Sequence, residues 1–459
     1  MSDRLNLYHQ LPYPLKFIAA SLRGYYLHWW RYGHDTEILV QQTLERDKWS
    51  EEQWKIYRET RLELLLHRAM TRVPFYRDYW HERRRHGDKS SWQELTNWPI
   101  LAKRDVRENS RRFIADDCNI SNLFEDHTGG TTGTPLKIYQ SRKTVQHWHA
   151  IYEARIRRWH GVNHNDHWAI FGGQMVTPLY RSKPPFWVEN MGLNQLYLST
   201  FHISSKNVKE YAKKINQFKP THLVVYPSSA VEFAREVLTQ NIELWQPKVV
   251  FSNAEAISTQ QRVILSKAFQ CKVISTYGMG EIVFGASECE NIKMHEWPET
   301  GILEVLDDNL QTVKKGATGS FYITGLINQD MPLVRYAIGD CGHLGKNENC
   351  SCGRSLPVMQ SIEGRISEMI QTLDGKKIFW LNPVFYDLNI VQGQIIQETL
   401  DRIRVNVIPS EGFGPSDFYQ IKHRLQQRVG QEININITPV DSLERGENGK
   451  VQQVISRIS

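Results

Sequence analysis

The chain has 459 residues, of which 40% are hydrophobic and 23% are charged, and its formal net charge is +6. This length supports one large domain and a smaller one, and the composition is that of a globular protein rather than a disordered or fibrous one. The positive excess suits polyanionic ligands but is too small and too dispersed to indicate nucleic acid binding, so we expect no nucleic acid partner.

The first predicted element is an amphipathic helix near the N-terminus. Apolar residues between Leu15 and Trp30 alternate with the basic residues Lys16, Arg23 and Arg31. Such a helix can rest on a membrane surface or pack on its own domain, and we favour packing. No apolar run reaches the roughly 20 residues of a membrane helix, and the N-terminus does not have the continuous apolar core of a signal peptide. We therefore expect a cytoplasmic protein whose membrane contact, if it has any, is peripheral.

Helices and strands alternate over the next part of the chain. Residues 49–72 have apolar side chains at helical spacing, and this helix ends at Val73-Pro74 because the residue before proline disfavours helical conformation. A polar helical piece spans 101–113, and a short strand from Phe124 leads into a loop. Further strands are predicted at 168–171, 222–226, 248–251 and 272–275, and further helices at 207–218, 229–240 and 258–269. This alternation predicts parallel sheets covered by helices.

The pattern changes to strands and turns from about residue 300. Strands are predicted at 302–306, 320–324 and 333–336, then at 403–408 and 433–438 around a helix at 416–429. Gly364-Arg365 looks like a domain junction. The predicted fold class is therefore α/β. A large N-terminal domain of residues 1–364 would hold helix-covered sheets and a strand-rich subdomain, and residues 365–459 would form a small α+β domain.

The sharpest local signal is a loop rich in glycine and threonine. It reads Thr128-Gly129-Gly130-Thr131-Thr132-Gly133-Thr134-Pro135. Glycines let the backbone approach a phosphate closely, and the threonine hydroxyls add hydrogen-bond donors. The loop is not of the Walker A type, since no Gly-Lys-Ser/Thr follows at the required spacing. Taken alone, the segment fits a phosphate loop and an ordinary turn about equally well.

This loop resembles the phosphate loop of the adenylate-forming superfamily, and further segments follow in that superfamily's order. They are Ser252-Asn253-Ala254-Glu255, Tyr277-Gly278-Met279-Gly280-Glu281, Arg335-Tyr336-Ala337-Ile338-Gly339-Asp340, Gly364-Arg365 and Gly449-Lys450. Within the superfamily the chain is most similar to the phenylacetate–coenzyme A ligase branch, and more narrowly to the CapK-type proteins of capsular-polysaccharide biosynthesis. The narrower likeness rests on Val73-Pro74-Phe75-Tyr76-Arg77, Trp98-Pro99-Ile100-Leu101-Ala102-Lys103, Glu288-Cys289-Glu290 and Cys350-Ser351-Cys352-Gly353-Arg354.

The resemblance implies an enzyme that uses ATP to activate a carboxylic acid as an acyl-adenylate, with release of pyrophosphate. The loop from Thr128 to Gly133, with Thr132 as a catalytic residue, would hold the β- and γ-phosphates. Glu281 would hold Mg²⁺, since a hard cation prefers carboxylate oxygen. Lys450 would stabilise negative charge at the α-phosphate.

The remaining nucleotide contacts also follow from the resemblance. Residues expected to bind ATP besides the loop are Asn253, Ala254, Glu255, Tyr277, Gly278, Asp340 and Arg365. Asp340 would accept both ribose hydroxyls through its two carboxylate oxygens. The small C-terminal domain is implied to be mobile and to rotate for the second half-reaction. Any one of these residues alone would fit an ordinary turn or a solvated surface, so the assignments depend on the ordered set.

Three departures from the family pattern concern mainly the second half-reaction. Thr134 stands where this branch often has lysine, Ser367 stands where the hinge aspartate is usual, and residues 376–385 do not cleanly match the thiolation motif. Coenzyme A is the expected acceptor of the acyl group. An amine or hydroxyl acceptor in surface-polysaccharide or natural-product assembly stays open, as does an inactive nucleotide-binding scaffold. The acid and the oligomeric state are not specified, and a dimer is compatible with the sequence.

Cysteine and histidine residues suggest a second, structural site. The candidate ligands are Cys289, His295, Cys350 and Cys352, with Cys341 and His343 as alternatives. Two pairs of zinc-compatible ligands can complete a tetrahedral site, although Cys-x-Cys is less diagnostic than Cys-x-x-Cys. The resemblance adds weight, because members of the phenylacetate ligase branch can carry a metal in this region. We therefore predict a structural Zn²⁺ ion held by three cysteines and one histidine.

Overall fold

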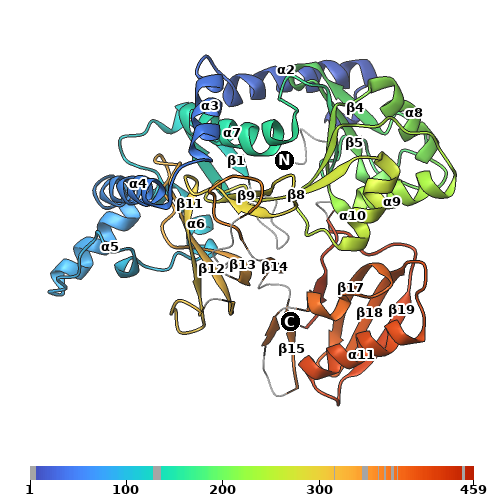
Figure 1. Ribbon diagram of the computed structural model, residues 1–459. Helices are drawn as coiled ribbons and strands as arrows, with labels where there is room; N and C mark the ends of the chain where they lie inside the picture. Colours follow the sequence, from blue (N-terminus) through green and yellow to red (C-terminus); the bar gives the residue numbers. More distant parts are fainter. Residues whose placement is uncertain are drawn as a thin grey trace. The chain divides into compact units, whose positions relative to one another are not determined.

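The computed structural model describes residues 7–127, 136–314, 316–343, 350–359, 361–365, 369–373, 377–379, 381–446 and 450–458 (Figure 1). The chain divides into two compact units. The first unit comprises Met1–Gly24, Asn165–Ser275 and Glu363–Ser459, and the second comprises Tyr25–His164 and Thr276–Ile362. Each unit therefore combines segments that are far apart in the sequence.

A mostly parallel sheet forms the centre of the first unit, with strand order β7-β6-β3-β5-β4 and β8 beside β7. Its strands are β3 (Trp168–Gly172), β4 (Trp187–Asn190), β5 (Gln195–Ser199), β6 (His222–Val225), β7 (Val249–Ser252) and the first residues of β8 (Lys272–Gly278). The helices packed on it are α8 (Val208–Phe218), α9 (Pro227–Thr239) and α10 (Thr259–Phe269). Only β4 runs antiparallel to its neighbour. The predicted alternation of strands and helices is confirmed.

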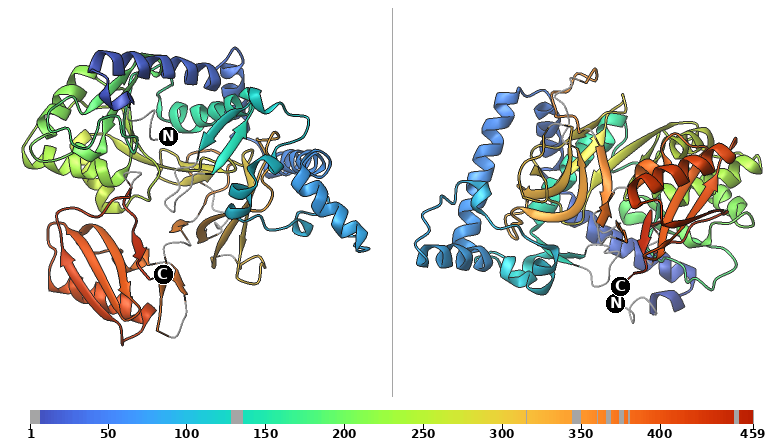
Figure 2. Two further views of the ribbon diagram at one scale, coloured as in Figure 1. Left: turned by 180° about the vertical axis from the view of Figure 1, so that it is seen from behind. Right: turned by 90° about the horizontal axis from the view of Figure 1, so that it is seen from below.

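A second sheet of the first unit lies in the C-terminal part of the chain, with order β19-β18-β17-β20. Its elements are β17 (Ile390–Thr399), β18 (Arg402–Pro409), α11 (Pro415–Val429), β19 (Asn434–Pro439) and β20 (Val454–Ser456), preceded by the pair β15 (Met369–Gln371) and β16 (Lys377–Phe379). Helix α11 covers the strands β17 to β19 and buries Ile421 and Leu425 against them (Figure 2). The sequence located β18, α11 and β19 but not β17 or β20. The predicted boundary at residues 364–365 stays a prediction.

The second unit combines helices with small antiparallel sheets. Its helices are α3 (Thr36–Arg46), α4 (Glu51–Arg72), α5 (Pro74–Arg85), α6 (Lys103–Glu108) and α7 (Arg142–Tyr152). Its strands are β1 (Phe124–His127), β2 (Lys137–Gln140), β9 (Gly285–Glu288), β10 (Met294–Glu296), β11 (Gly301–Leu306), β12 (Thr318–Gly325) and β13 (Tyr336–His343). Strand β14 (Ser361–Arg365) extends the order β11-β12-β13-β14. As predicted, α4 ends just before Val73-Pro74, and Pro74 starts a new helix at its first position.

One predicted strand is misplaced. The strand expected at 333–336 begins only at Tyr336 and continues to His343. Leu333 and Val334 are buried, but the backbone turns at Arg335, whose φ is +48°. The Val334 amide donates to the hydroxyl of Tyr76 (3.0 Å). The apolar run therefore reflects burial in the core and not a strand.

Helix α2 (Tyr13–Arg31) leads from the first unit into the second. Lys16, Ser21 and Trp30 of α2 are buried. In the described ranges of the chain, no helix has both the length and the apolar character that crossing a bilayer requires.

Candidate active site

The predicted site residues fall into two groups, one in each unit. The second unit holds Tyr277, Gly278, Glu281 and Asp340, and the first unit holds the segment from Asn253 to Glu255 together with Lys450. The loop of residues 128–135 lies outside the described residues, as do Ser367 and Gly449, so the predicted phosphate contacts stay predictions. Arg365 is the last residue of β14, and its predicted role also stays a prediction.

Tyr277 and Asp340 are joined directly in the second unit. The Tyr277 hydroxyl donates a hydrogen bond to Oδ2 of Asp340 (2.7 Å). Tyr277 lies near the end of β8 and pairs with Ala286 of β9. Asp340 lies where the register between β12 and β13 shifts, and the preceding Gly339 has φ of +87°, a conformation that favours glycine. A bulge of this kind redirects a side chain, which explains why Gly-Asp occurs in mid-strand.

Glu281, four residues after Tyr277 in the sequence, lies in a charge-balanced network. Its side chain is only 3% exposed, and its Oε1 accepts from Lys103 Nζ and from the Tyr336 hydroxyl, both at 2.9 Å. Backbone hydrogen bonds join Leu101 to the start of β13 and so place the beginning of α6, where Lys103 lies, beside that strand. A buried carboxylate is costly unless it is paired, and Lys103 supplies that charge.

The sequence indicated Lys103 and Tyr336 only as members of motifs and gave them no role. Both belong to segments that carried the family resemblance, which is the signal that could have identified them. The carboxylate of Glu281 is the kind of donor that Mg²⁺ prefers. Since Lys103 already contributes one positive charge at Oε1 (2.9 Å), a magnesium ion bound to Glu281 would share the carboxylate with Lys103 or displace it.

Glu255 belongs to the first unit, and its side chain contacts the first turn of α9. Its carboxylate accepts from the Ser228 amide (2.9 Å), the Ser228 hydroxyl (2.9 Å) and the Val451 amide (3.1 Å). Burial raises the pKa of Glu255, and the bonds from Ser228 partly oppose that shift. The exposed amides at a helix N-terminus favour such a carboxylate. The preceding Ala254 has φ of +70°. Glu255 ends the predicted adenine-contacting segment, and a hydrogen bond thus joins it to Val451, the residue that follows Lys450.

Arg445 reinforces the same connection. Its guanidinium donates to the hydroxyls of Ser228 (2.8 Å) and Ser229 (2.7 Å) and to Glu232 (3.0 Å). An isolated bridge pairs Arg445 with Val451, which closes the turn that carries Lys450. The described part of this turn is therefore anchored on α9.

Lys450 lies over an aromatic ring of the first unit. Its ammonium group is 5.4 Å from the centroid of the Tyr226 ring, a distance at which cation–π attraction operates. Tyr226 is the residue that precedes α9. The sequence singled out Lys450 but not Arg445, because an arginine five residues away in a polar stretch is not diagnostic.

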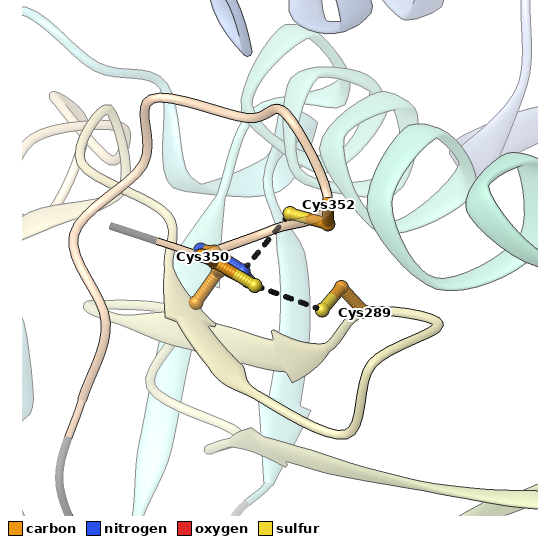
Figure 3. A group of neighbouring side chains, drawn as sticks. Cys289, Cys350 and Cys352 are labelled. Atoms are coloured by element: carbon orange, nitrogen blue, oxygen red, sulfur yellow. Dashed lines mark hydrogen bonds between the residues drawn. The ribbon is translucent and has the colours of Figure 1, made fainter. Parts of the chain in front are cut away.

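The four predicted zinc ligands converge in the second unit. The ligand atoms of Cys289, His295, Cys350 and Cys352 all lie within 4.8 Å of one another. Cys289 follows β9, and Cys350 and Cys352 lie in a loop facing it (Figure 3). The sulfurs of Cys289 and Cys350 are 3.7 Å apart, and the Cys352 sulfur is 3.4 Å from Nε2 of His295. The alternatives Cys341 and His343 lie in β13 and are not in this cluster.

These distances suit a tetrahedral ion. With a zinc–sulfur bond of about 2.3 Å, two tetrahedral sulfurs lie about 3.8 Å apart. His295 directs Nε2 to the cysteines while its Nδ1 is 3.1 Å from the Leu356 carbonyl, the outer contact that fixes the ring of a metal-bound histidine. Burial raises the pKa of the Cys289 thiol to about 11, so the thiolate form needs a cation to stabilise it. The donor set and spacing therefore fit zinc.

Comparison with known proteins gives one family match. Residues 370–457 match the CapK C-terminal domain. Over 381 residues the chain is 27% identical to protein CapK of Staphylococcus aureus, covering 81% of this chain and 82% of that protein. It is 22% identical over 436 residues to a phenylacetate–coenzyme A ligase of Aromatoleum evansii, covering 90% of this chain and 96% of the relative. The chain is a homologue of CapK and of phenylacetate–coenzyme A ligases.

A solved structure shows the same fold as this chain. It is a 2-hydroxyisobutyryl-CoA ligase in the postadenylation state, with a TM-score of 0.64, 19% identity, and coverage of 87% of this chain and 88% of that one. The predicted resemblance and the predicted α/β fold class are confirmed. The matched CapK C-terminal domain includes Arg445 and Lys450.

Proposed function

We propose that this chain is an AMP-forming ligase that activates a carboxylic acid with ATP and then transfers the acyl group to coenzyme A. The observation that carries the proposal is the grouping of Tyr277, Glu281 and Asp340, whose partners lie on neighbouring elements of one unit. Homology to phenylacetate–coenzyme A ligases over 90% of the chain supports it. Solved neighbours of the same fold bind an acyl-adenylate and, in one state, coenzyme A.

The first half-reaction forms a bond between a carboxylate oxygen and the α-phosphorus of ATP. The bond from that phosphorus to the oxygen bridging to the β-phosphate breaks, and pyrophosphate leaves with the electron pair. In this proposal Asp340 binds the ribose hydroxyls and Tyr277 contacts the adenine while its hydroxyl orients Asp340. Lys450 stabilises the negative charge that builds up around the α-phosphate. Mg²⁺ held through Glu281 would supply further positive charge to the phosphates.

The second half-reaction forms a bond between the thiolate sulfur of coenzyme A and the acyl carbon. The bond between that carbon and the oxygen attached to phosphorus breaks, and AMP leaves. In this proposal the hydrogen bonds of Arg445 and Glu255 would hold the described part of the Lys450 turn in place for the first half-reaction. Positioning of this kind contributes to rate because the reacting groups need not be reordered.

The cysteine and histidine cluster has a separate role in the proposal. A Zn²⁺ ion held by Cys289, His295, Cys350 and Cys352 would be structural, since all four positions of a tetrahedral ion are filled by protein ligands. It would tie the loop around Cys350 to strands β9 and β10 near the Tyr277 motif.

A second class of acyl acceptor, an amine or a hydroxyl group, is the alternative for the second half-reaction. The C-terminal residues 370–457 match the CapK C-terminal domain, and the predicted thiolation motif had no clean match in the sequence. An amine or hydroxyl acceptor would give an amide or ester by the same displacement of AMP. Adenylation is common to both alternatives.

Pyrophosphate release tests the proposal. Purified protein with ATP and Mg²⁺ is given a panel of acids that includes phenylacetate and 2-hydroxyisobutyrate, and hydroxylamine traps any acyl-adenylate as a hydroxamate. We expect acid-dependent pyrophosphate release, and a thioester when coenzyme A replaces hydroxylamine. Hydroxamate without thioester would favour an amine or hydroxyl acceptor. Bound ATP with no release for any acid would contradict the proposal and favour the inactive scaffold.

A further inference from the structure

Helix α2 presents an apolar stripe to the solvent. Six large side chains on it are each between 44% and 66% exposed. They are Leu15, Ile18, Leu22, Tyr25, Tyr26 and Trp29. Their spacing of three and four residues places them along one side of the helix. Large apolar side chains gathered in this way mark an interaction surface, whereas exposed apolar residues scattered singly do not.

The opposite side of α2 is fixed to the protein. Ser21 is buried and accepts a hydrogen bond from the Met191 amide (3.1 Å). A Cβ atom added at Gly24 would lie 1.8 Å from Oδ1 of Asn190, so a larger residue there would require the Asn190 side chain to move. Further along the helix, the Trp30 ring lies 5.2 Å from that of Phe124. The other side of the helix is packed against the protein, and the stripe therefore faces the solvent.

The charges of α2 have a single sign. The helix contains no aspartate or glutamate, and its charged residues are Lys16, Arg23 and Arg31. Lys16 is buried, and Arg23 is exposed. Arg142 adds a further positive charge, since its guanidinium lies 4.1 Å from the centroid of the Trp29 ring and donates to the Trp29 carbonyl. The stripe therefore combines exposed aliphatic residues, three aromatic residues and basic residues.

We propose that α2 holds this protein peripherally on an anionic phospholipid surface. Tyrosine and tryptophan favour the headgroup level of a bilayer, where one side of the ring is apolar and the other is wet. Leucine and isoleucine beside them reach the acyl boundary, and arginine is attracted to anionic headgroups. The helix cannot span the bilayer, so the contact is parallel to the surface.

A second copy of the chain is a less suitable occupant of this stripe. A two-fold interface places the same helix on both sides of the contact. Arg23 of each copy, and Arg142 beside Trp29, would then face a helix that carries no acidic residue. Like charges brought together in this way oppose association, whereas an anionic lipid surface complements them.

Vesicle flotation with matched variants tests this surface. Full-length protein is mixed with vesicles of phosphatidylcholine alone, or of phosphatidylcholine and phosphatidylglycerol in equal parts, and the floated fraction is measured. Ile18→Glu introduces a charge into the stripe, and Ile56→Glu introduces the same charge at an isoleucine of α4 that is similarly exposed (56% against 49%). Equal thermal midpoints for the two variants and the wild type show that folding is preserved.

We expect the wild type to float with the anionic vesicles and much less with phosphatidylcholine alone. Ile18→Glu should lower the binding constant by at least about tenfold, because burial of an apolar side chain is lost, and Ile56→Glu should not change it. Added salt should weaken binding by screening the headgroups. Wild-type protein that does not float with anionic vesicles would overturn the proposal. A dimer that Ile18→Glu converts to a monomer would instead assign the stripe to a second copy.

Discussion

The two units hold their candidate site residues in different ways. In the second unit, Tyr277, Glu281 and Asp340 have partners on neighbouring strands and on the start of α6, and Glu281 is almost fully buried. In the first unit, Glu255 meets the Lys450 turn through a hydrogen bond that joins positions 196 residues apart. The described contacts there are mainly polar, and they include the three bonds of Arg445.

In the proposed function, this difference would separate nucleotide binding from catalysis. The Arg445–Glu232 pair is partly exposed at both groups and can break and re-form without unfolding the sheet, whereas Glu281 is almost fully buried and would lose its counter-charge if its bond to Lys103 broke. We therefore expect changes in the second unit to affect nucleotide affinity and stability. Changes around Lys450 should affect the rate of adenylation.

The sharpest test of this separation is Lys450→Ala. Loss of a group that stabilises transition-state charge should lower the rate of adenylation by about 10²- to 10³-fold. The affinity for ATP, measured by calorimetry, should change much less. Lys422→Ala, at an exposed lysine of α11, is the control and should behave as the wild type. Equal losses of rate and affinity would mean that Lys450 is misassigned.

The reverse pattern is expected for Asp340→Ala. Hydrogen bonds to a charged group contribute about 1.5–3 kcal/mol, so the affinity for ATP should fall by roughly 10- to 100-fold. Asp308→Ala, in the exposed turn after β11, serves as the control. An unchanged dissociation constant in calorimetry would show that Asp340 does not contact the nucleotide.

Arg445 tests whether the polar contacts on α9 hold the Lys450 turn. Arg445→Ala should slow adenylation about tenfold, the effect of losing one or two charge-assisted hydrogen bonds, with little change in ATP affinity. Arg445→Lys should be intermediate, because lysine cannot direct several donors from one planar group. Acyl transfer from an adenylate supplied to the enzyme should be unaffected. If that step slows as much as adenylation, Arg445 has a general structural role.

The smallest effect expected is on stability, from loss of the proposed zinc. Cys352→Ser, or treatment with a chelator, should remove about one zinc per chain and lower the melting temperature by a few degrees. Metal content by mass spectrometry and a thermal scan measure both. Cys118→Ser, at a cysteine outside the cluster, should change neither. Wild-type protein that contains no zinc when purified would contradict the proposed zinc site.

The sequence predicted those features that depend on local pattern. Helical spacing and Pro74 located α4 and its end, and the four cysteine and histidine residues that cluster were predicted from residue type and spacing with support from the family resemblance. The strand expected at 333–336 was wrong, because burial and strand formation leave the same apolar signal. The partners of Glu281 could not be found, since Lys103 is 178 residues away and contacts it only after folding. Arg445 was missed for the same reason, as its role depends on hydroxyls more than 200 residues earlier.

Isotope tracing tests the central claim most directly. The acid that releases most pyrophosphate is prepared with ¹⁸O in its carboxylate, and the nucleotide product is analysed by mass spectrometry after acyl transfer. Attack on the α-phosphorus predicts that one labelled oxygen remains in AMP, because the acyl bond breaks on the carbon side. Label in inorganic phosphate or pyrophosphate, or unlabelled AMP, would contradict adenylation by this chain.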